Sequence, residues 1–342
     1  MPTAYVYDPR YLEHAAPYGE HPERPMRLMA ITDVLARRGA LARMTGLDPR
    51  PVSDADLLLA HSPTYVKQIE AISAQGGGHL DPDTYLVSGS YDIARLAAGG
   101  CVTAVDAVLD GRCDNAFALI RPPGHHAFAD HGEGFCLFNN VAVAARHAQT
   151  RGQQRVAIVD FDVHHGNGTQ AIFYDDPDVL YISTHQWPLY PGTGHWREIG
   201  HGLGRGATLN IPLPPGVGDT GFSHVWDDLI QPAVVRHQPD ILFISAGFDA
   251  HWRDPLAMLQ WSIHGMAEMT DNLVALAGRL CGGRIVAVLE GGYDLDALGY
   301  GSLAVARALL GDRTVSDPLG PSTWPEEDVT SIVEALRRLH GL

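Results

Sequence analysis

The chain has little positive charge. Its 24 Lys and Arg residues stand against 40 Asp and Glu residues, which gives a formal net charge of −16 at pH 7 with neutral histidines. This balance argues against a nucleic-acid backbone as the main partner, because binding to phosphates depends on Lys and Arg. It is compatible with a cationic substrate or product. We therefore expect no direct binding of nucleic acid.

Cysteines are few and widely scattered, at Cys101, Cys113, Cys136 and Cys281. They form neither a CxxC pair nor the dense framework of secreted domains, so we expect them to be reduced. The first ten residues lack a basic segment followed by an apolar one, and no uncharged apolar run reaches membrane-spanning length. We therefore expect a cytoplasmic protein with no membrane partner.

Internal repeats and long linkers are also missing. No period of about 20 to 50 residues recurs, and we interpret the glycines at 76–78 and the Pro/Gly-rich stretch at 212–218 as internal loops. A chain of 342 residues that is 45% hydrophobic and 19% charged can bury a large core. We predict a single domain over residues 1–342.

What the sequence does have is an alternation of apolar, β-branched segments with helical patterns. This alternation is typical of an α/β fold, a parallel sheet with helices on both faces. We predict strands near residues 4–7, 116–120, 155–160, 179–184, 207–211, 241–245 and 284–289. We predict helices near residues 25–38, 54–60, 63–74, 90–110, 139–151, 220–236, 263–278 and 296–310. Ser53 and Asp56 resemble a capping box at the start of the second helix.

Five polar clusters each follow one of the predicted strands. The most informative one begins at Asp160, directly behind the apolar run 156–159, and reads Asp-Phe-Asp-Val-His-His. Residues two apart on an extended chain point the same way, so Asp162 and His164 can converge on one metal ion while Asp160 supports them from behind. A lone Asp-x-His pair would more often lie in a solvated loop. The other four clusters lie at 121–126, 184–187, 245–249 and 290–294.

The carboxyl ends of parallel strands open on one rim of a sheet, where such folds bind ligands. The five clusters should therefore meet there. Asp162, His164 and Asp249 would supply two carboxylate oxygens and one imidazole nitrogen, with room left for a water and a substrate oxygen. Zn²⁺ or Fe²⁺ fits such a site, and the sequence does not distinguish them. A metal of this kind acidifies water and polarises a carbonyl, which predicts hydrolysis of an amide or ester.

The adjacent residues His125 and His126 are candidates for the base that this reaction needs. Asp160 and Asn167 on the neighbouring loop are the candidate partners of the two rings. A carboxylate keeps an imidazole more cationic than an amide does, so the two rings should divide the roles. Tyr293 can donate to the oxyanion of a tetrahedral intermediate. Taken alone, the histidine pair is more often structural, Asn167 can be a turn residue, and Tyr293 can be a packed aromatic.

Longer motifs resemble those of a known family, the zinc-dependent histone deacetylase and acetylpolyamine amidohydrolase superfamily, class II branch. The similar motifs are RPPGHHA from Arg121, GFCLFNN from Gly134, VDFDVHHGNGTQ from Val159, SAGFDA from Ser245 and EGGY from Glu290. The resemblance covers about residues 18–311 and begins with the sequence HPERP at His21. It implies a deacetylase-like catalytic domain with the arginase/deacetylase fold, in which one open parallel sheet carries the active site at the carboxyl ends of its strands.

The resemblance also implies roles for individual residues. His126 would be the general base and acid, and His125 paired with Asp160 would give electrostatic support. Tyr293 would polarise the acyl carbonyl, and Asn167 matches the class II pattern. The zinc ligands would be Asp162, His164 and Asp249. The ligands of a structural monovalent cation, K⁺ or Na⁺, would be Asp160, Asp162, His164 and Ser183.

A narrow tunnel is the substrate site that the resemblance implies. Gly134, Phe135 and Tyr190 would line it around an acyl-lysine stem, although Tyr190 stands where the family has phenylalanine. Asp83 aligns roughly with the residue that grips the substrate backbone. Polyamine deacetylases of the class II type carry a glutamate just after the Asp-Pro that follows the third ligand, and here Leu256 occupies that position.

Leu256 favours an acylated lysine peptide or a similar acylated amine as the substrate, from which an acetyl or other acyl group is removed. Acetylpolyamine hydrolysis is the alternative, and a catalytically silent acyl-lysine-binding module is a more distant one. Hydroxamate-type inhibitors are expected to bind. The acyl preference, the native metal, the oligomeric state and the shape of the loops at 76–90 and 187–206 do not follow from the sequence.

Overall fold

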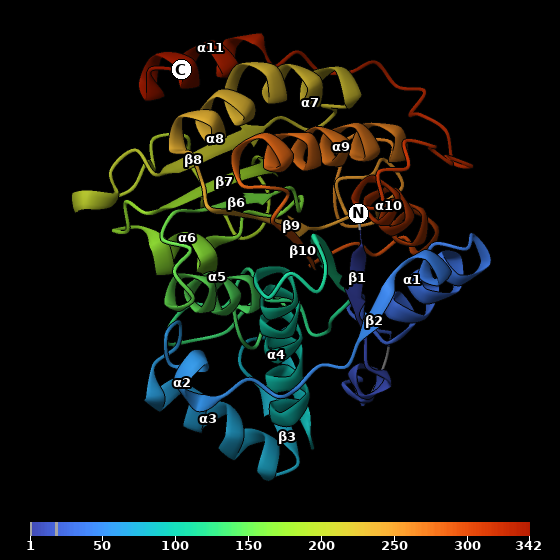
Figure 1. Ribbon diagram of the computed structural model, residues 1–342, viewed down its shortest axis with the longest axis vertical. Coiled ribbons are helices and arrows are strands. Elements are labelled where there is room, and N and C mark those ends of the chain that lie inside the picture. Colours follow the sequence, from blue (N-terminus) through green and yellow to red (C-terminus); the bar gives the residue numbers. More distant parts are fainter. Residues whose placement is uncertain (1, 18–19) are drawn as a thin grey trace.

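Eight parallel strands form the sheet around which the chain is built (Figure 1). Their order is β2-β1-β5-β10-β9-β6-β7-β8. The computed structural model describes residues 2–17 and 20–342. The strands of this sheet are β1 (Thr3–Val6), β2 (Thr45–Leu47), β5 (Asn115–Ala118), β6 (Val156–Asp160), β7 (Val179–Gln186), β8 (Thr208–Leu213), β9 (Ile241–Ala246) and β10 (Ile285–Leu289).

All seven predicted strands are confirmed within a residue or two. Every residue of β5 to β10 in this sheet is buried, as expected for parallel strands covered on both faces. The structure adds β2, a short, mostly exposed edge strand whose Thr-Gly-Leu sequence carries no strand pattern. It also adds an antiparallel hairpin of β3 (Gly77–His79) and β4 (Tyr85–Val87) inside the segment that we interpreted as a loop.

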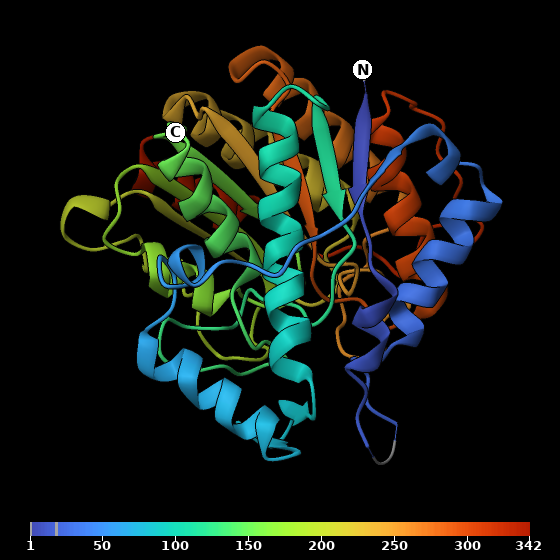
Figure 2. The same ribbon diagram turned by 60° about the horizontal axis from the view of Figure 1, so that its bottom comes forward.

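Helices cover both faces of the sheet (Figures 1 and 2). On one face, α1 packs on α10 and α10 packs on α9, with α7, α8 and α11 beside them; on the other, α4 packs on α5 and on the strands, and α6 contacts β7. The bounds are α1 (Met26–Arg37), α2 (Asp54–Leu57), α3 (Pro63–Ala74), α4 (Ser90–Leu109), α5 (Asn140–Thr150), α6 (Asn167–Phe173), α7 (Asp219–Val225), α8 (Gln231–His237), α9 (Ile263–Leu280), α10 (Leu295–Leu309) and α11 (Thr330–His340).

Three short 3-10 helices and one π-helical turn complete the described elements. They are η1 (Pro9–Glu13), η2 (Leu41–Arg43), η3 (Gly202–Gly204) and the π turn η4 (Trp226–Ile230). The helix predicted over 220–236 is therefore wrong as a continuous α-helix, because α7 runs through η4 into α8. Pro232 lies in the first turn of α8 and has no N–H to donate to the preceding turn, which explains the break.

The helix predicted over 54–60 is also shorter than expected and ends at Leu57. Its predicted N-terminal cap is present, because the Ser53 hydroxyl accepts a hydrogen bond from the N–H of Asp56 at 3.1 Å. All four cysteines are buried and free. Among the described residues, no helix has the length and apolar character that crossing a membrane requires.

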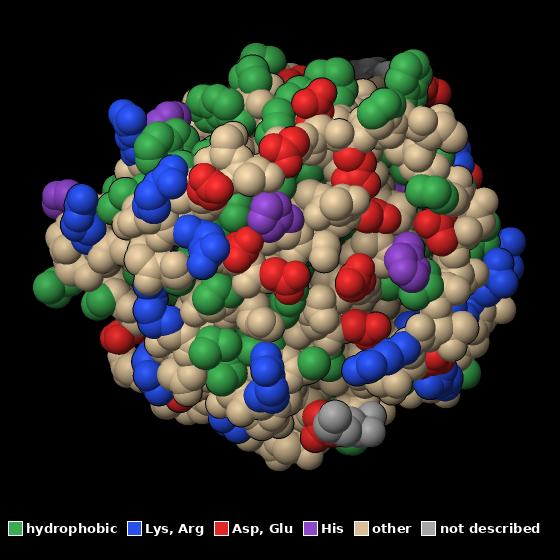
Figure 3. All heavy atoms as spheres, turned by 90° about the horizontal axis from the view of Figure 1, so that it is seen from above, with side chains coloured by type: hydrophobic (Ala, Val, Ile, Leu, Met, Phe, Trp, Pro, Cys, Tyr) green, Lys and Arg blue, Asp and Glu red, His purple; other side chains and the backbone are tan. Residues whose placement is uncertain are grey.

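One face of the molecule shows how the excess of acidic residues is distributed. Figure 3 looks onto the side covered by α7, α9 and α11, where Asp and Glu side chains occupy much of the centre and Lys and Arg lie mainly toward the edges. This arrangement agrees with the net charge of −16.

The register of the strands brings the polar clusters to one level. Asp160 at the end of β6 pairs with Ser183 of β7 and with Ser245 of β9. Since all strands of the sheet are parallel, the segments that follow β5, β6, β9 and β10 leave it on the same rim. The fold thus places the predicted site residues at that rim.

Candidate active site

The three predicted metal ligands lie together at this rim. Asp162 and His164 follow β6, and Asp249 follows β9. One ligand atom from each lies within 4.8 Å of the others, and all three residues are buried. Nδ1 of His164 is 3.1 Å from Oδ1 of Asp162 and 3.2 Å from Oδ2 of Asp249. Two carboxylates and one imidazole therefore face a common point.

The remaining carboxylate oxygens show that this group fits a cation. Oδ1 of Asp249 accepts from the N–H of Val163 at 2.9 Å, and Oδ2 of Asp162 accepts from the N–H of Gly291 at 2.8 Å. Oδ2 of Asp249 is buried and, apart from its contact with the co-ligand His164 at 3.2 Å, has no hydrogen-bond partner among residues 2–17 and 20–342. A buried carboxylate oxygen without a partner is costly unless it binds a cation. The donor set is therefore that of a divalent metal site with O, O and N ligands.

Two glycines leave room for these carboxylates. A Cβ atom on Gly247 would lie 2.2 Å from Oδ2 of Asp162, and one on Gly291 would lie 2.2 Å from Oδ2 of Asp249. Any side chain at either position would push a carboxylate away from the common point.

The adjacent histidines have the two partners that the sequence suggested. Nδ1 of His125 lies 3.1 Å from Oδ2 of Asp160, and Nδ1 of His126 lies 2.8 Å from Oδ1 of Asn167. Burial alone would lower the pKa of His125, but the carboxylates of Asp162 and Asp160 outweigh it and raise the pKa to about 10. A cation on Asp162 would reduce this rise. Burial, together with the charge of His125, holds the pKa of His126 well below its ordinary value. The two rings therefore differ in how readily they gain a proton.

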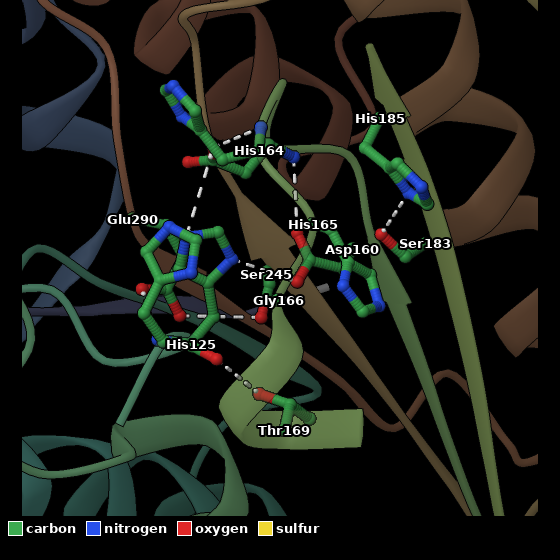
Figure 4. A network of polar contacts seen from close by, with 12 residues as sticks. His125, Asp160, His164, His165, Gly166, Thr169, Ser183, His185, Ser245 and Glu290 are labelled. Carbon is green, nitrogen blue, oxygen red and sulfur yellow. Dashed lines mark hydrogen bonds and ion pairs between the residues drawn. The ribbon is translucent and has the colours of Figure 1, made fainter. Parts of the chain in front are cut away.

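Three separate elements hold His125 in place (Figure 4). Asp160 comes from β6, Glu290 follows β10, and Thr169 belongs to α6. Oε2 of Glu290 accepts from the N–H of His125 at 3.2 Å, and the N–H of Thr169 donates to the carbonyl of His125 at 3.0 Å. Tyr181 adds a hydrogen bond to Oδ2 of Asp160 at 2.9 Å. The role of α6 was not predicted, because its seven residues begin within a Gly-Asn-Gly sequence that is typical of a turn.

Tyr293 is positioned by two residues that the sequence analysis did not single out. The guanidinium carbon of Arg27 lies 5.1 Å from the centre of the Tyr293 ring, and Nε of Arg27 donates to the carbonyl of Gly292 at 2.8 Å. Oδ2 of Asp254 accepts from the N–H of Tyr293 at 2.7 Å. The sequence analysis considered the segment around Asp254 only for Leu256. The contact between Asp254 and the Tyr293 backbone is visible only in the folded structure.

A buried charge cluster supports Arg27. Glu23 forms ion pairs with Arg27, at 3.1 Å, and with Arg121. Burial would raise the pKa of Glu23, but the charge of Arg121 prevails and lowers it to about 2. Glu23 belongs to the HPERP motif and Arg27 follows it by four residues, but Arg121 is 98 residues away, so the pattern gave no sign that these three charges are buried together.

A cavity of about 500 Å³ opens onto the metal group and the histidine pair. Its lining includes every residue predicted to contact the substrate, namely Asp83, Gly134, Phe135, Tyr190 and Leu256. It also includes His125, His126, His164 and Tyr293. Asp83 and Tyr190 are exposed, so the cavity runs from buried polar groups to the surface.

The cavity wall has an unusual backbone at Phe135, where φ is 70°. A positive φ in a bulky residue costs about 1–3 kcal/mol and is found mainly at functional sites. The Phe135 and Tyr293 ring centres are 5.9 Å apart, and those of Tyr190 and His126 are 5.2 Å apart. Phe135 and Tyr190 thus stand beside the groups predicted to be catalytic.

Ser183, the fourth predicted ligand of a monovalent cation, is level with Asp160 on the neighbouring strand. Its hydroxyl lies 2.9 Å from Nδ1 of His185, as Figure 4 shows. Nε2 of His185 lies 2.9 Å from the carbonyl of Gly194. This contact connects the segment that carries Tyr190 to the sheet.

Comparison with known proteins agrees with this geometry. A family model described as the histone deacetylase domain matches residues 21–309. The chain belongs to the histone deacetylase family. It is 44% identical to a probable deacetylase of Archaeoglobus fulgidus, over all of this chain and 98% of that protein. It is also 44% identical to a histone deacetylase-like amidohydrolase of Pseudomonas aeruginosa, over 89% of this chain and 80% of that protein.

Among solved structures, the crystal structure of the HDA15 HD domain matches with a TM-score of 0.90 and 38% identity, over 99% of this chain and 95% of that one. The predicted arginase/deacetylase fold is confirmed, as is the family suggested by the motifs. Deacetylases and amidohydrolases among the relatives support a hydrolytic deacetylase function for this histone deacetylase family member.

Proposed function

We propose that the protein is a zinc-dependent amidohydrolase that removes acetyl or other acyl groups from the side-chain amine of lysine or from a similar acylated amine. The observation that carries this proposal is the buried group of Asp162, His164 and Asp249 beside two histidines with different partners, at the base of a cavity. Iron as Fe²⁺ would suit the same donors, so the identity of the metal is part of the proposal.

The residues of the site divide the reaction among them. A divalent cation held by the three ligands would acidify a water molecule and polarise the acyl carbonyl. His126 is the general base, since its Nδ1 contacts Asn167 and leaves Nε2 free to take a proton and return it to the leaving amine. His125, cationic beside Asp160, stabilises negative charge. Tyr293, held by Arg27 and Asp254, donates to the acyl oxygen as it gains charge.

The mouth of the cavity favours a cationic substrate. The described lining residues include the carboxylates of Glu20, Asp81 and Asp83 and contain no Lys or Arg. Leu256, 36% exposed, stands where a polyamine enzyme would carry glutamate, which favours an acylated lysine in a basic peptide. The mouth carboxylates could also receive the second ammonium group of an acetylpolyamine, so that substrate remains the alternative.

The proposal also covers a second bound ion, inhibitors and binding partners. We propose K⁺ or Na⁺ as a structural ion near Asp160 and Ser183, binding of hydroxamates at the metal, and no direct binding of nucleic acid or membranes. The cytoplasmic location and the single catalytic domain over 1–342 stay predictions.

A panel of fluorogenic acyl-lysine peptides and acylpolyamines, assayed with zinc-loaded protein and its Tyr293→Phe variant, tests the function. We expect turnover of acyl-lysine substrates by the wild type and a fall of at least about 10²-fold in kcat for Tyr293→Phe. A preference for acetylpolyamines would select the alternative substrate. If the metallated wild type binds a hydroxamate but hydrolyses no acylated amine, the silent acyl-lysine-binding module is the correct reading.

A further inference from the structure

Glu133 contacts the partner of the proposed base. Nδ2 of Asn167 donates to Oε1 of Glu133 at 2.6 Å, while Oδ1 of Asn167 lies 2.8 Å from Nδ1 of His126. A chain of hydrogen bonds thus runs from the cavity through Asn167 to a half-buried carboxylate. We propose that Glu133 is a positioning residue that fixes the orientation of the Asn167 amide and, through it, the tautomer of His126. This inference rests on the function proposed above.

The orientation matters because the two ends of a carboxamide are nearly equal in size but opposite in hydrogen bonding. An ionised carboxylate only accepts, so Glu133 requires the NH₂ end of Asn167 to face it. The oxygen end then faces His126, whose Nδ1 must carry the proton. Nε2 keeps its lone pair and can act as a base.

The opposite orientation would disable the base. If the NH₂ end of Asn167 faced His126, Nδ1 would have to accept and the ring proton would move to Nε2. A neutral imidazole protonated at Nε2 cannot take a proton there from water. Glu133 therefore acts on catalysis by selecting one of two amide orientations, without touching the reacting atoms.

One further contact favours the same orientation. The N–H of Gly168 donates to Oδ1 of Asn167 at 3.1 Å. This bond joins adjacent residues and is longer than the one to Glu133, which is the only partner of Nδ2 in the described part of the chain. Removal of Glu133 should consequently weaken the preference for the active orientation rather than abolish it.

The backbone around Glu133 is shaped to bring it there. Gly134 has φ of 56°, and a Cβ atom at this position would lie 2.4 Å from Cδ2 of His126. The chain therefore passes directly against the His126 ring. The N–H of Cys136 donates to the carbonyl of Glu133 at 3.0 Å and closes the turn.

Asp130, three residues earlier, offers a matched control. Its side chain is 76% exposed and lies 2.8 Å from His131, which does not line the cavity. Asp130→Asn removes one negative charge from the same loop without affecting Asn167. Any effect specific to Glu133 should be missing in this variant.

Steady-state kinetics of Glu133→Ala, Glu133→Gln and Asp130→Asn with an acyl-lysine substrate form the first test. We expect Glu133→Ala to lower kcat about tenfold, by analogy with the loss of a hydrogen-bond partner behind a metal-ligating side chain, with KM changed less than about twofold. Glu133→Gln should fall between Glu133→Ala and the wild type, because its amide oxygen still accepts. Asp130→Asn should match the wild type. A kcat for Glu133→Ala within twofold of the wild type would overturn the proposal.

The ¹⁵N chemical shifts of the His126 ring, assigned with His126→Ala, give a readout that needs no turnover. We expect the Nδ1-protonated tautomer in the wild type and an added Nε2-protonated population in Glu133→Ala. If the wild type hydrolyses nothing but the two proteins show this difference in tautomer, the positioning role is retained and the proposed function is rejected. If the wild type is active and both proteins show the same tautomer, the positioning role alone is rejected. If Glu133→Ala does not fold, Glu133→Gln carries both tests, with a smaller expected shift of population and rate.

Discussion

At the scale of single residues, the site depends on what each histidine contacts. His125 and His126 are neighbours of the same type, yet one faces the carboxylate of Asp160 and the other the amide of Asn167. The first gains a proton readily and the second stays neutral. A neutral imidazole is required to accept a proton from water, so the assignment of the base follows from these partners.

We expect His126→Ala to lower turnover by about 10²–10⁴-fold, the usual contribution of a general acid–base group. Its metal content should equal that of the wild type, since His126 is not among the three grouped ligands. Activity assays and elemental analysis of the same preparation measure both. His131→Ala, at a side chain that is 51% exposed, is the control and should change neither. Near-normal turnover in His126→Ala would remove the assigned base.

At the scale of elements, the sequence predicts strands and rim residues whose pattern lies within one continuous segment. It does not predict features that depend on contacts between distant segments. The apolar runs predicted seven strands, and the polar residues behind them predicted the rim. By contrast, the edge strand β2 has no strand pattern in its sequence, and it is recognised only by its pairing with β1 in the folded structure. The segment that forms α6 resembles a turn, and the pairing of Glu23 with Arg121, 98 residues away, is known only once the chain is folded.

The segments after β9 and β10 must pass close to the ligands, which glycine permits. In Gly291→Ala the added Cβ would lie 2.2 Å from Oδ2 of Asp249. We expect this variant to lose at least about tenfold in metal affinity while its far-UV circular dichroism stays native.

Gly278→Ala is the matched control, because Gly278 lies in α9 with no atom within 4 Å of the added Cβ. It should bind metal normally and be stabilised by up to about 1 kcal/mol. Equal metal affinities for the two variants would contradict the steric argument.

At the scale of the whole molecule, Glu23 connects the N-terminal segment to both Arg27 of α1 and Arg121 beyond β5. Its pKa is about 2 in the folded protein against an ordinary value of 4.5. A carboxyl with a lowered folded pKa stabilises fully above its unfolded pKa and loses this contribution as the pH falls toward the folded one. The contribution of Glu23 should therefore decline between pH 4.5 and pH 2.

Replacing Glu23 by Gln leaves two buried guanidinium groups without their anion, which costs about 3–5 kcal/mol at pH 7. Urea unfolding of Glu23→Gln and wild type at pH 7 and pH 3 measures the difference in their free energies of unfolding. We expect this difference to be about 2 kcal/mol smaller at pH 3, because the unfolded wild type then binds a proton that the folded one does not. A difference of equal size at both pH values would show that Glu23 is not held ionised.

The central claim is that Asp162, His164 and Asp249, from the segments that follow two separate strands, hold one divalent metal ion. Metal stoichiometry by elemental analysis, in the wild type and in Asp249→Ala after dialysis against the same zinc buffer, tests it most directly. We predict one zinc ion per wild-type chain and less than about a tenth of that in Asp249→Ala. A wild type that retains no metal, or an Asp249→Ala variant that retains a full equivalent, would contradict the account.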